Sequence, residues 1–256
     1  MASQDRFGYE WSRYSSLDPN YEGQFWNWVA PLSAKDFAGK RVIDAGCGMG
    51  RNSYWALRAG AKEVLAFDYN ESSLDSARKT LAEYKNVKIQ FLDIHKIPFE
   101  NEFDVAMSIG VIHHLEDSAL ALKGLFKSLV VGGTLVIWVY SKEGYEWVPN
   151  YINPIRKHIT SKLPLVIVEA VSFVLSIPLY LFVKLAKPRS SYLRQLGSFG
   201  LAHIRSIVFD QLIPTIANYW TKEQVKQLFT DSGIKNFNIY RPSNENGWTV
   251  VAKKQV

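Results

Sequence analysis

The chain has 256 residues, 47% of them hydrophobic and 21% charged, which is ample for one large α/β domain and marginal for two. Its 16 glycines and 10 prolines form no low-complexity tract or repeat, so collagen-like, disordered and solenoid proteins are excluded. The single cysteine, Cys47, excludes a disulfide framework and a cysteine-cluster metal site, and it is typical of a reducing compartment.

Residues 1–36 precede the first predicted strand. Residues 1–14 contain charged side chains and no apolar run, so we expect no secretory signal and a cytoplasmic protein. The aromatic-rich stretch 7–14 is predicted to cover a bound ligand, with a helix packed on the sheet as the alternative.

Strands and helices alternate over residues 37–140. Apolar runs predict the strands, and apolar residues at helical spacing predict the helices between them. The predicted strands span 41–45, 64–67, 87–91, 103–109 and 134–140, and the predicted helices span 52–58, 71–84 and 119–129. This alternation is typical of βαβ crossovers in a mostly parallel sheet.

The alternation resumes at residues 219–256, after an insertion at 141–218. Thr221 and Gln224 have the spacing of a capping box, and Gly233 suits the end of the helix that they begin. The elements predicted here are a helix at 221–231 and hairpin strands at 236–240 and 247–252. Because the hairpin must join the sheet begun upstream, the insertion is an excursion from one domain.

The insertion holds most of the net charge and the longest apolar run. It contains nine basic and four acidic residues, which is +5 of the total charge of +6. Residues 163–185 are interrupted only by Glu169, Ser172, Ser176 and Lys184 among the polar types. As a helix this run is roughly 34 Å long, enough to span a bilayer.

A single membrane span is excluded, because it would place the two halves of one sheet on opposite sides of the membrane. Pro164 and Pro178 interrupt helical hydrogen bonding. One prediction is therefore a bent element that dips into one leaflet, with flanking cations against anionic headgroups. The alternative is an apolar lid helix buried against the main domain or against a second subunit.

A glycine-rich loop follows the first strand, in the sequence VIDAGCGMG at 42–50. Its glycines let a ligand touch the backbone, but Arg51 makes the spacing differ from the dinucleotide pattern G-x-G-x-x-G. Asp44, just before the loop, is unsuited to a pyrophosphate. It favours a ligand that bears a positive charge.

Two further acids close the second and third strands. Asp68 follows Gly48 by 20 residues, and at a strand's carboxyl end its carboxylate can accept from both hydroxyls of a ribose. Asp93 occupies the corresponding place on the third strand, where it can accept from an adenine amino group. Three acids at three strand ends are hard to explain as solvated surface.

These motifs resemble the class I S-adenosylmethionine-dependent methyltransferases, in their bacterial branch of small-molecule, lipid and glycan enzymes. IDAGCGMG is similar to the family's first motif, FDYNESSL to its second, FLDI to its third, and FDVAMSIGVIHHL to its fourth with the segment after it. The resemblance implies S-adenosyl-L-methionine as cofactor. It also implies a Rossmann-like seven-stranded sheet of order 3-2-1-4-5-7-6, with a helical, apolar insertion after strand 5.

Together these observations divide the chain into four segments. The segments are an N-terminal cap at 1–36, a cofactor-binding core at 37–140, an insertion for acceptor, lid or membrane contact at 141–218, and a C-terminal helix and hairpin at 219–256. Arg205, residues 209–214, Tyr219 and Trp220 resemble a stretch found before the late helix in glycan and secondary-metabolite enzymes, and we expect these residues to face the acceptor.

The same resemblance implies roles for individual residues in binding the methionine part. Gly46 and Gly48 approach it, and Asp44 lies near its ammonium group. The residues implied to line this part from the fourth strand are Ser108, Ile109 and Gly110.

For the nucleoside part, the resemblance implies that Asp68 binds the ribose. Asp93 then binds the adenine amino group, and Ile94 offers a backbone N–H to the ring. Tyr69 flanks the adenine, with simple core packing as the alternative.

His113 and His114 follow the fourth strand, where an acceptor must approach the sulfonium. His114 matches the position at which many relatives carry histidine, so it is the candidate general base. A structural hydrogen bond is the alternative, because methyl transfer depends mainly on positioning.

These observations favour a cytoplasmic methyltransferase acting on an amphipathic or lipid-linked small molecule, with oxygen the favoured acceptor atom. We expect peripheral contact with an anionic membrane, no metal and no nucleic-acid partner, and the sequence leaves the oligomeric state open. The alternatives are a methyltransferase of a soluble sugar or secondary metabolite, and a catalytically silent cofactor-binding scaffold.

Overall fold

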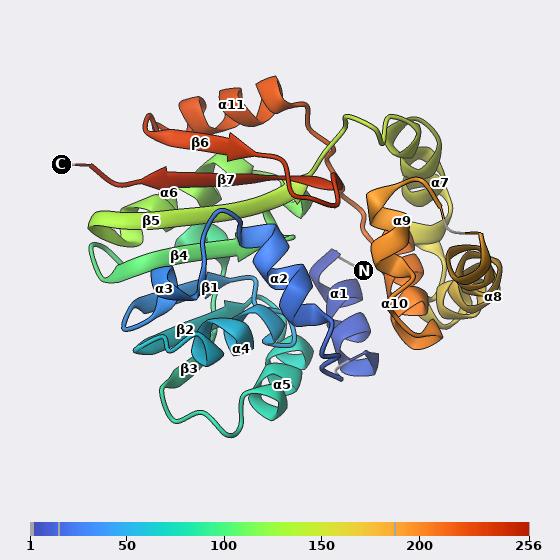
Figure 1. Ribbon diagram of the computed structural model, residues 1–256, viewed down its shortest axis with the longest axis horizontal. Coiled ribbons are helices and arrows are strands. Elements are labelled where there is room, and N and C mark those ends of the chain that lie inside the picture. Colours follow the sequence, from blue (N-terminus) through green and yellow to red (C-terminus); the bar gives the residue numbers. More distant parts are fainter. Residues whose placement is uncertain (1–2, 15, 187, 256) are drawn as a thin grey trace.

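A seven-stranded sheet of order β3-β2-β1-β4-β5-β7-β6 forms the centre of the computed structural model, which describes residues 3–14, 16–186 and 188–255 (Figure 1). Its strands are β1 (Arg41–Ala45), β2 (Glu63–Asp68), β3 (Val87–Phe91), β4 (Phe103–Ile109), β5 (Leu129–Tyr140), β6 (Phe237–Tyr240) and β7 (Gly247–Lys253). Strands β1 to β5 pair in parallel, whereas β7 is antiparallel to both β5 and β6. The predicted sheet order and closing hairpin are therefore confirmed.

Helices cover both faces of this sheet, because successive strand side chains point to opposite sides. Val42 belongs to one hydrophobic core and Ile43 to the other. The first core is covered by α2 (Tyr21–Val29), α3 (Ala34–Phe37), α4 (Arg51–Arg58) and α5 (Glu71–Thr80), and the second by α6 (Ser118–Ser128) and α11 (Lys222–Asp231). As predicted, Thr221 and Gln224 form a reciprocal capping box at the start of α11.

Some predicted boundaries were wrong. Strand β5 begins at Leu129, five residues before the predicted start, because Leu129 pairs with Phe103 and the ladder shifts register before Val105. The preceding helix consequently ends at Ser128. Helix α5 ends at Thr80 rather than at residue 84, and the residues after it form a turn.

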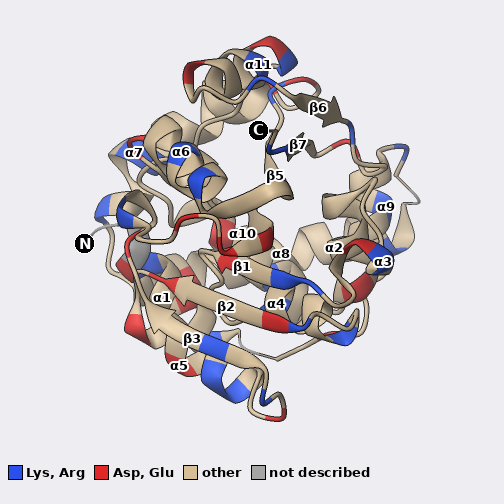
Figure 2. Ribbon diagram, turned by 90° about the vertical axis from the view of Figure 1, so that its left-hand side faces the viewer, with Lys and Arg blue, Asp and Glu red and all other residues tan. Residues whose placement is uncertain are grey.

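The insertion forms a helical layer beyond the carboxyl end of β5, at the right of Figure 1. Its elements are η3 (Val148–Ile152), α7 (Asn153–His158), η4 (Thr160–Lys162), α8 (Leu165–Leu185), α9 (Ser191–Leu196) and α10 (Leu201–Leu212). Figure 2 shows basic residues on α7, which carries Arg156 and Lys157 in its last turn.

Helix α1 (Ser3–Arg13) joins this layer to the main domain. The buried guanidinium of Arg6 donates to the carbonyls of Thr160 at 2.8 Å and Ile213 at 2.9 Å. On the other side α1 packs on α5 so closely that a Cβ at Gly8 would lie 2.0 Å from Oδ1 of Asn70. The N-terminal segment is therefore a helix clamped between two parts of the protein.

Helix α8 is oriented by its single acid. Glu169 is buried and accepts from Tyr9 Oη at 2.7 Å, Arg205 Nη2 at 2.8 Å and Arg13 Nη2 at 3.2 Å. Burial raises the pKa of this carboxyl, but the hydrogen bond from Tyr9 and the two guanidinium groups outweigh burial and lower it below its ordinary value. These contacts hold the Glu169 side of α8 against α1 and α10.

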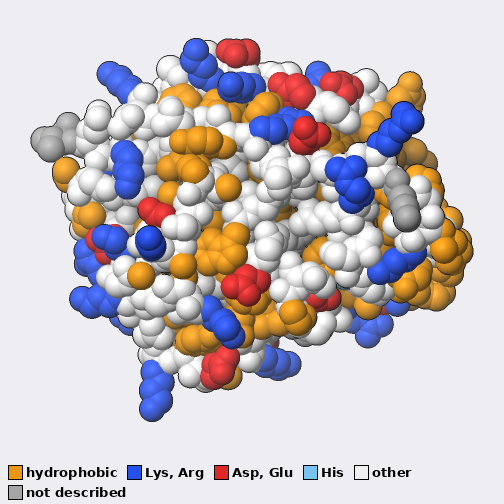
Figure 3. Space-filling model, viewed as in Figure 1, with side chains coloured by type: hydrophobic (Ala, Val, Ile, Leu, Met, Phe, Trp, Pro, Cys, Tyr) orange, Lys and Arg blue, Asp and Glu red, His pale blue; other side chains and the backbone are white. Residues whose placement is uncertain are grey.

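The opposite side of α8 is an exposed apolar face. Its exposed members are Val166, Ile167, Val171, Phe173, Val174, Leu175, Ile177, Leu181, Phe182 and Leu185. Hydrophobic side chains gather at the right-hand edge of Figure 3, where α8 lies in Figure 1. The prediction that this side is buried against the main domain is therefore wrong. By length and composition alone, the helix could cross a membrane. Pro178 lies inside the helix and does not end it.

We expect Glu169→Ala to lower the free energy of unfolding by about 2 kcal/mol or more, because it leaves the buried side of Arg205 without its partner. Since the folded pKa of Glu169 is lowered, its stabilisation is present above about pH 4.5 and is lost as the pH falls below that value. Urea unfolding at several pH values measures this. Ile167→Ala, two residues away and exposed, is the control; equal losses in both variants would contradict the orientation of α8.

Candidate functional site

A cavity of about 170 Å³ lies where β1, β2 and β4 end, at the point where the strand order reverses. Two segments distant in sequence, α1 and α10, close it. The lining residues are Phe7, Trp11, Gly46, Cys47, Gly48, Met49, Arg51, Asn52, Phe67, Asp68, Tyr69, Leu92, Ile94, Ile109, Gly110, Val111, His114, Leu115 and Asp210.

The glycine loop forms the floor of the cavity. Gly46 and Cys47 both donate their backbone N–H to the carbonyl of Phe67 at 2.9 Å, so the loop is tied to the end of β2. Gly48 has φ +54°, and a Cβ there would lie 2.9 Å from Nε1 of Trp11. Both the backbone conformation and the indole therefore require glycine at this position.

Asp68 connects the loop to the second strand. Its Oδ2 accepts from the N–H of Gly48 at 2.9 Å, and its side chain lines the cavity. Burial raises its pKa to about 6, although bonds from the N–H of Gly48, Tyr69 and Asn70 oppose the rise. A ligand that donates hydrogen bonds to this carboxylate would favour its ionised form.

The edge of the cavity beyond Asp68 is aromatic and apolar. The ring of Tyr69 lies 5.0 Å from that of Phe91, and Tyr69 remains half exposed. Leu92 and Ile94 line the same edge, whereas Asp93 between them accepts from the N–H of His95 at 2.9 Å and starts the short helix η1 (Ile94–Lys96).

Eight of the eleven predicted site residues line the cavity. They are Gly46, Gly48, Asp68, Tyr69, Ile94, Ile109, Gly110 and His114. The other three do not line it: the buried Ser108 donates to the carbonyl of Ala45 at 2.9 Å, the buried Asp44 accepts from Ser53 Oγ at 2.6 Å, and the partly exposed Asp93 caps η1. Their ligand contacts stay predictions. Burial raises the pKa of Asp44 to about 7.

His114 lines the cavity with a defined tautomer. Its Nδ1 lies 2.7 Å from the carbonyl of Ile216, which can only accept, so Nδ1 carries the proton of the neutral ring and Nε2 holds the free lone pair. Burial lowers the pKa of His114 to about 4, so the ring is neutral at physiological pH. His113 is instead fully buried, with its ring centroid 3.9 Å from that of Tyr140.

Arg51 is a lining residue that the sequence pattern did not single out. It begins α4, directly after the loop, and its guanidinium carbon lies 4.7 Å from the ring centroid of Tyr21, 5.3 Å from that of Trp28 and 5.7 Å from that of Trp11. These aromatic faces hold a cation at the cavity. The only signal in the sequence was its position after the glycines.

Asp210 and Arg205 were both expected to face the acceptor. Asp210 lines this cavity from α10, whereas Arg205 pairs with Glu169 at 2.8 Å. Burial raises its pKa, although a hydrogen bond from Tyr140 opposes the rise. Glu10 is also buried, and neither carboxyl oxygen has a hydrogen-bond partner among the described residues. Burial, followed by the charge of Asp210, raises the pKa of Glu10 well above its ordinary value.

The lining suits a cationic nucleoside better than a metal. It combines a carboxylate at a strand end for ribose hydroxyls, an aromatic edge for a base, open backbone at the glycines and a cation for a carboxylate. Across residues 3–14, 16–186 and 188–255, no group of at least three His, Cys, Asp or Glu side chains is placed to hold a metal ion.

Comparison with known proteins identifies the domain. A family model described as "Methyltransferase domain" matches residues 36–172. A tRNA U34 carboxymethyltransferase of Vibrio cholerae is 32% identical over 130 residues, which are 47% of this chain and 39% of that protein. One of Pseudomonas fluorescens is 32% identical over 123 residues, or 46% and 38% of the two chains. The chain thus spans about two-fifths of the length of the curated relatives it matches.

Solved structures share the fold. Magnesium protoporphyrin IX methyltransferase from Synechocystis PCC 6803, solved with bound SAH, has a TM-score of 0.59 at 15% identity, over 98% of both chains. A putative S-adenosyl-L-methionine-dependent methyltransferase from Methanococcus maripaludis has a TM-score of 0.54 at 16% identity, over 100% of this chain and 94% of that one. At these identities the likeness shows the fold alone.

We expect Asp68→Asn to stabilise the ligand-free protein at pH 8. A raised folded pKa means that the folded state binds the proton more tightly, so stability is lost as the pH rises from about 4 through 6. Since one pKa unit corresponds to about 1.4 kcal/mol, the asparagine variant gains up to about 3 kcal/mol at pH 8 and little near pH 4. Urea unfolding at both pH values measures the gain. A loss of stability at pH 8 would contradict the burial of this carboxylate.

Proposed function

This chain belongs to the family of S-adenosylmethionine-dependent methyltransferases, and we propose that it methylates an oxygen atom of an amphipathic or lipid-linked acceptor at a membrane surface. The reaction class follows from the family. One observation carries the inference about the acceptor: the insertion that contributes Asp210 to the cofactor cavity also presents the exposed apolar face of α8.

When bound, S-adenosylmethionine supplies an electrophilic methyl group. In the proposed arrangement Asp68 accepts from the ribose hydroxyls, and Tyr69 flanks the adenine. Gly46 and Gly48 let the methionine part approach the backbone, and Arg51 pairs with its carboxylate. Each role uses a side chain or backbone group that lines the cavity.

His114 is the proposed general base. Its Nε2 is the ring atom that is free to accept a proton, because Nδ1–H donates to Ile216. As the acceptor oxygen takes up the methyl group, its proton passes to Nε2. The low pKa keeps this nitrogen unprotonated well below neutral pH.

The proposed membrane contact rests on charge beside the apolar face of α8. Lys162 precedes the helix, and Lys184 and Arg189 lie in and after its last turn; all three are exposed. Lys187, which belongs to the same basic group in the sequence, lies outside the described residues. Each basic residue near an anionic leaflet contributes about 1 kcal/mol, so these cations favour attachment to the cytoplasmic leaflet.

A tRNA is the second candidate acceptor, because the curated relatives quoted above are tRNA U34 carboxymethyltransferases. Transfer of label from methyl-tritiated S-adenosylmethionine to tRNA, rather than to membrane lipids, would favour it. Transfer to a soluble sugar or secondary metabolite would favour a polar acceptor. Cofactor binding without transfer to any acceptor class would favour a silent scaffold.

We expect Asp68→Asn to weaken S-adenosylhomocysteine binding about tenfold or more, because a hydrogen bond to a charged group contributes about 1.5 to 3 kcal/mol. In the wild type the affinity falls as the pH drops below about 6, since binding then requires ionisation of Asp68. Calorimetry measures both effects. Unchanged affinity in the folded variant would refute the ribose assignment.

We expect His114→Asn to lower kcat about a hundredfold with S-adenosylhomocysteine affinity retained. Asparagine can still donate to the carbonyl of Ile216, so the variant removes the base and keeps the structural bond. The wild-type kcat, measured at saturating S-adenosylmethionine, should stay flat down to about pH 5, because the pKa of His114 is about 4. Full activity of the asparagine variant would assign His114 a structural role only. His113→Ala is the control for the neighbouring ring, and its kcat is compared once the variant is shown to be folded.

We expect the protein to float with phosphatidylcholine vesicles in proportion to their content of phosphatidylglycerol, and binding should fall with added salt. Phe173→Asp with Leu181→Asp should abolish flotation, because both side chains lie on the apolar face of α8. Leu120→Asp, at an exposed leucine of α6, is the matched control. If the protein does not bind vesicles at low salt, the proposed membrane contact is refuted, and the apolar face of α8 is instead expected to be a subunit interface.

A further inference from the structure

A second and larger cavity, of about 640 Å³, lies between the insertion and the carboxyl end of β5. Its walls are mostly aliphatic and tyrosine side chains from β5, α8, α9 and α10. Its volume is in the range of cavities that enclose a small organic ligand.

A hydrogen-bonded wall separates the second cavity from the cofactor cavity. Tyr140 Oη donates to Oδ2 of Asp210 at 3.1 Å and accepts from Nε2 of Gln211 at 3.2 Å, and Tyr219 Oη donates to Oε1 of Gln211 at 3.0 Å. Asp210 lines the cofactor cavity, while Tyr140, Gln211 and Tyr219 line the second one. The side of the second cavity nearest the cofactor is therefore its phenolic, hydrogen-bonding side.

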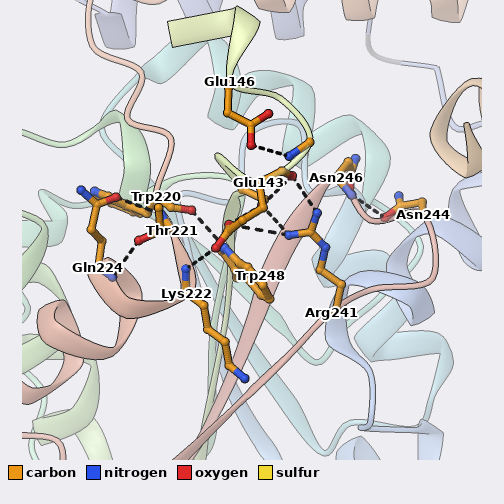
Figure 4. Close-up of polar contacts among 12 residues, drawn as sticks. Glu143, Glu146, Trp220, Thr221, Lys222, Gln224, Arg241, Asn244, Asn246 and Trp248 are labelled. Carbon is orange, nitrogen blue, oxygen red and sulfur yellow. Dashed lines mark hydrogen bonds and ion pairs between the residues drawn. The ribbon is translucent and has the colours of Figure 1, made fainter.

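Another side of the second cavity is polar, but its polar side chains already have partners within the protein. Arg241 donates from Nη2 to the carbonyl of Glu143 at 2.8 Å and from Nη1 to Ser141 Oγ, and its guanidinium carbon lies 4.5 Å from the ring centroid of Trp248 (Figure 4). Asn244 Nδ2 nearby donates to Gln195 Oε1 at 2.8 Å. Because this arginine is engaged with the protein, the cavity favours a neutral ligand over an anionic one.

The rim of the second cavity is continuous with the exposed face of α8. Leu175 lines the cavity and is 48% exposed on that face, and Trp147 lines it while 54% exposed. An apolar molecule that rests against α8 thus meets apolar side chains all the way into the cavity. Contact with this apolar rim would not add to the binding free energy of a soluble polar acceptor.

We propose that the second cavity binds the methyl acceptor, a neutral amphipathic alcohol or phenol that enters from the bilayer past α8 and places its hydroxyl against Tyr140. This inference rests on the proposed function, since it assigns the acceptor of that reaction. It makes Tyr140 a positioning residue, which exchanges its contact with Asp210 for one with the acceptor hydroxyl. This exchange opens the wall between the cavities toward His114, whose ring centroid lies 5.7 Å from that of Tyr140.

Two ligands without charge, farnesol and 4-nonylphenol, probe the cavity in calorimetric titrations of the full chain. At least one should bind the wild type with one molecule per chain. Leu179→Trp, which fills the cavity from α8, should weaken that binding at least tenfold, and so should Leu193→Trp from α9. Leu181→Trp, two residues away on the exposed face of α8, is the matched control and should bind as the wild type does.

Tyr140→Phe should weaken binding about threefold to tenfold, which is the loss expected for one hydrogen bond. S-adenosylhomocysteine should bind the three tryptophan variants normally, which also shows that they are folded. Thermal unfolding checks the fold of Tyr140→Phe, because the Tyr140 hydroxyl contacts Asp210 of the cofactor cavity. The proposed acceptor site would be overturned if neither probe bound the wild type. It would also be overturned if both cavity-filling variants bound the probes as tightly as the wild type does. Failure of S-adenosylhomocysteine to bind the wild type would instead refute the proposed function, whatever the probes do.

Discussion

The hydrogen bond from the backbone of Gly48 to Asp68 is the contact on which the proposed cofactor site depends. It joins the loop after β1 to the end of β2 at 2.9 Å, next to the point where the strand order reverses. The parallel sheet brings these two ends together, and the left-handed backbone of Gly48 lets the loop turn beneath Trp11. Burial of Asp68 costs stability in the ligand-free protein, which is typical of a group arranged for a ligand.

A second constraint acts on the insertion. Apolar contacts alone do not fix the rotation of a helix as apolar as α8. Glu169 fixes it by accepting hydrogen bonds from Tyr9, Arg13 and Arg205. The same contacts couple the N-terminal helix, which covers the cofactor cavity, to the helix that carries the apolar face. The proposed membrane contact and the proposed closure over the cofactor would thereby lie on one connected set of helices.

Local patterns were sufficient for the existence of the strands, the glycine loop and the place of Asp68 as a strand-end acid, because each is set by neighbouring residues. The sheet order followed from the family resemblance instead, because it pairs strands that are distant in sequence. Arg51 was missed because its aromatic cage comes from α1 and α2, and only packing brings Trp11, Tyr21 and Trp28 to it. The place of Asp210 and the whole second cavity depend on how the insertion folds back, which no local spacing encodes. For the same reason hydropathy found the apolar run but not which side of it is exposed.

The most direct test of the account follows the methyl group. The protein is incubated with methyl-tritiated S-adenosylmethionine and a membrane lipid extract of the source organism, and the products are partitioned between organic solvent and water. We expect label in the organic phase, as a base-stable ether, and its loss in the His114→Asn variant. Label that stays in the aqueous phase, or that transfers only to added tRNA, would contradict a lipid-like acceptor.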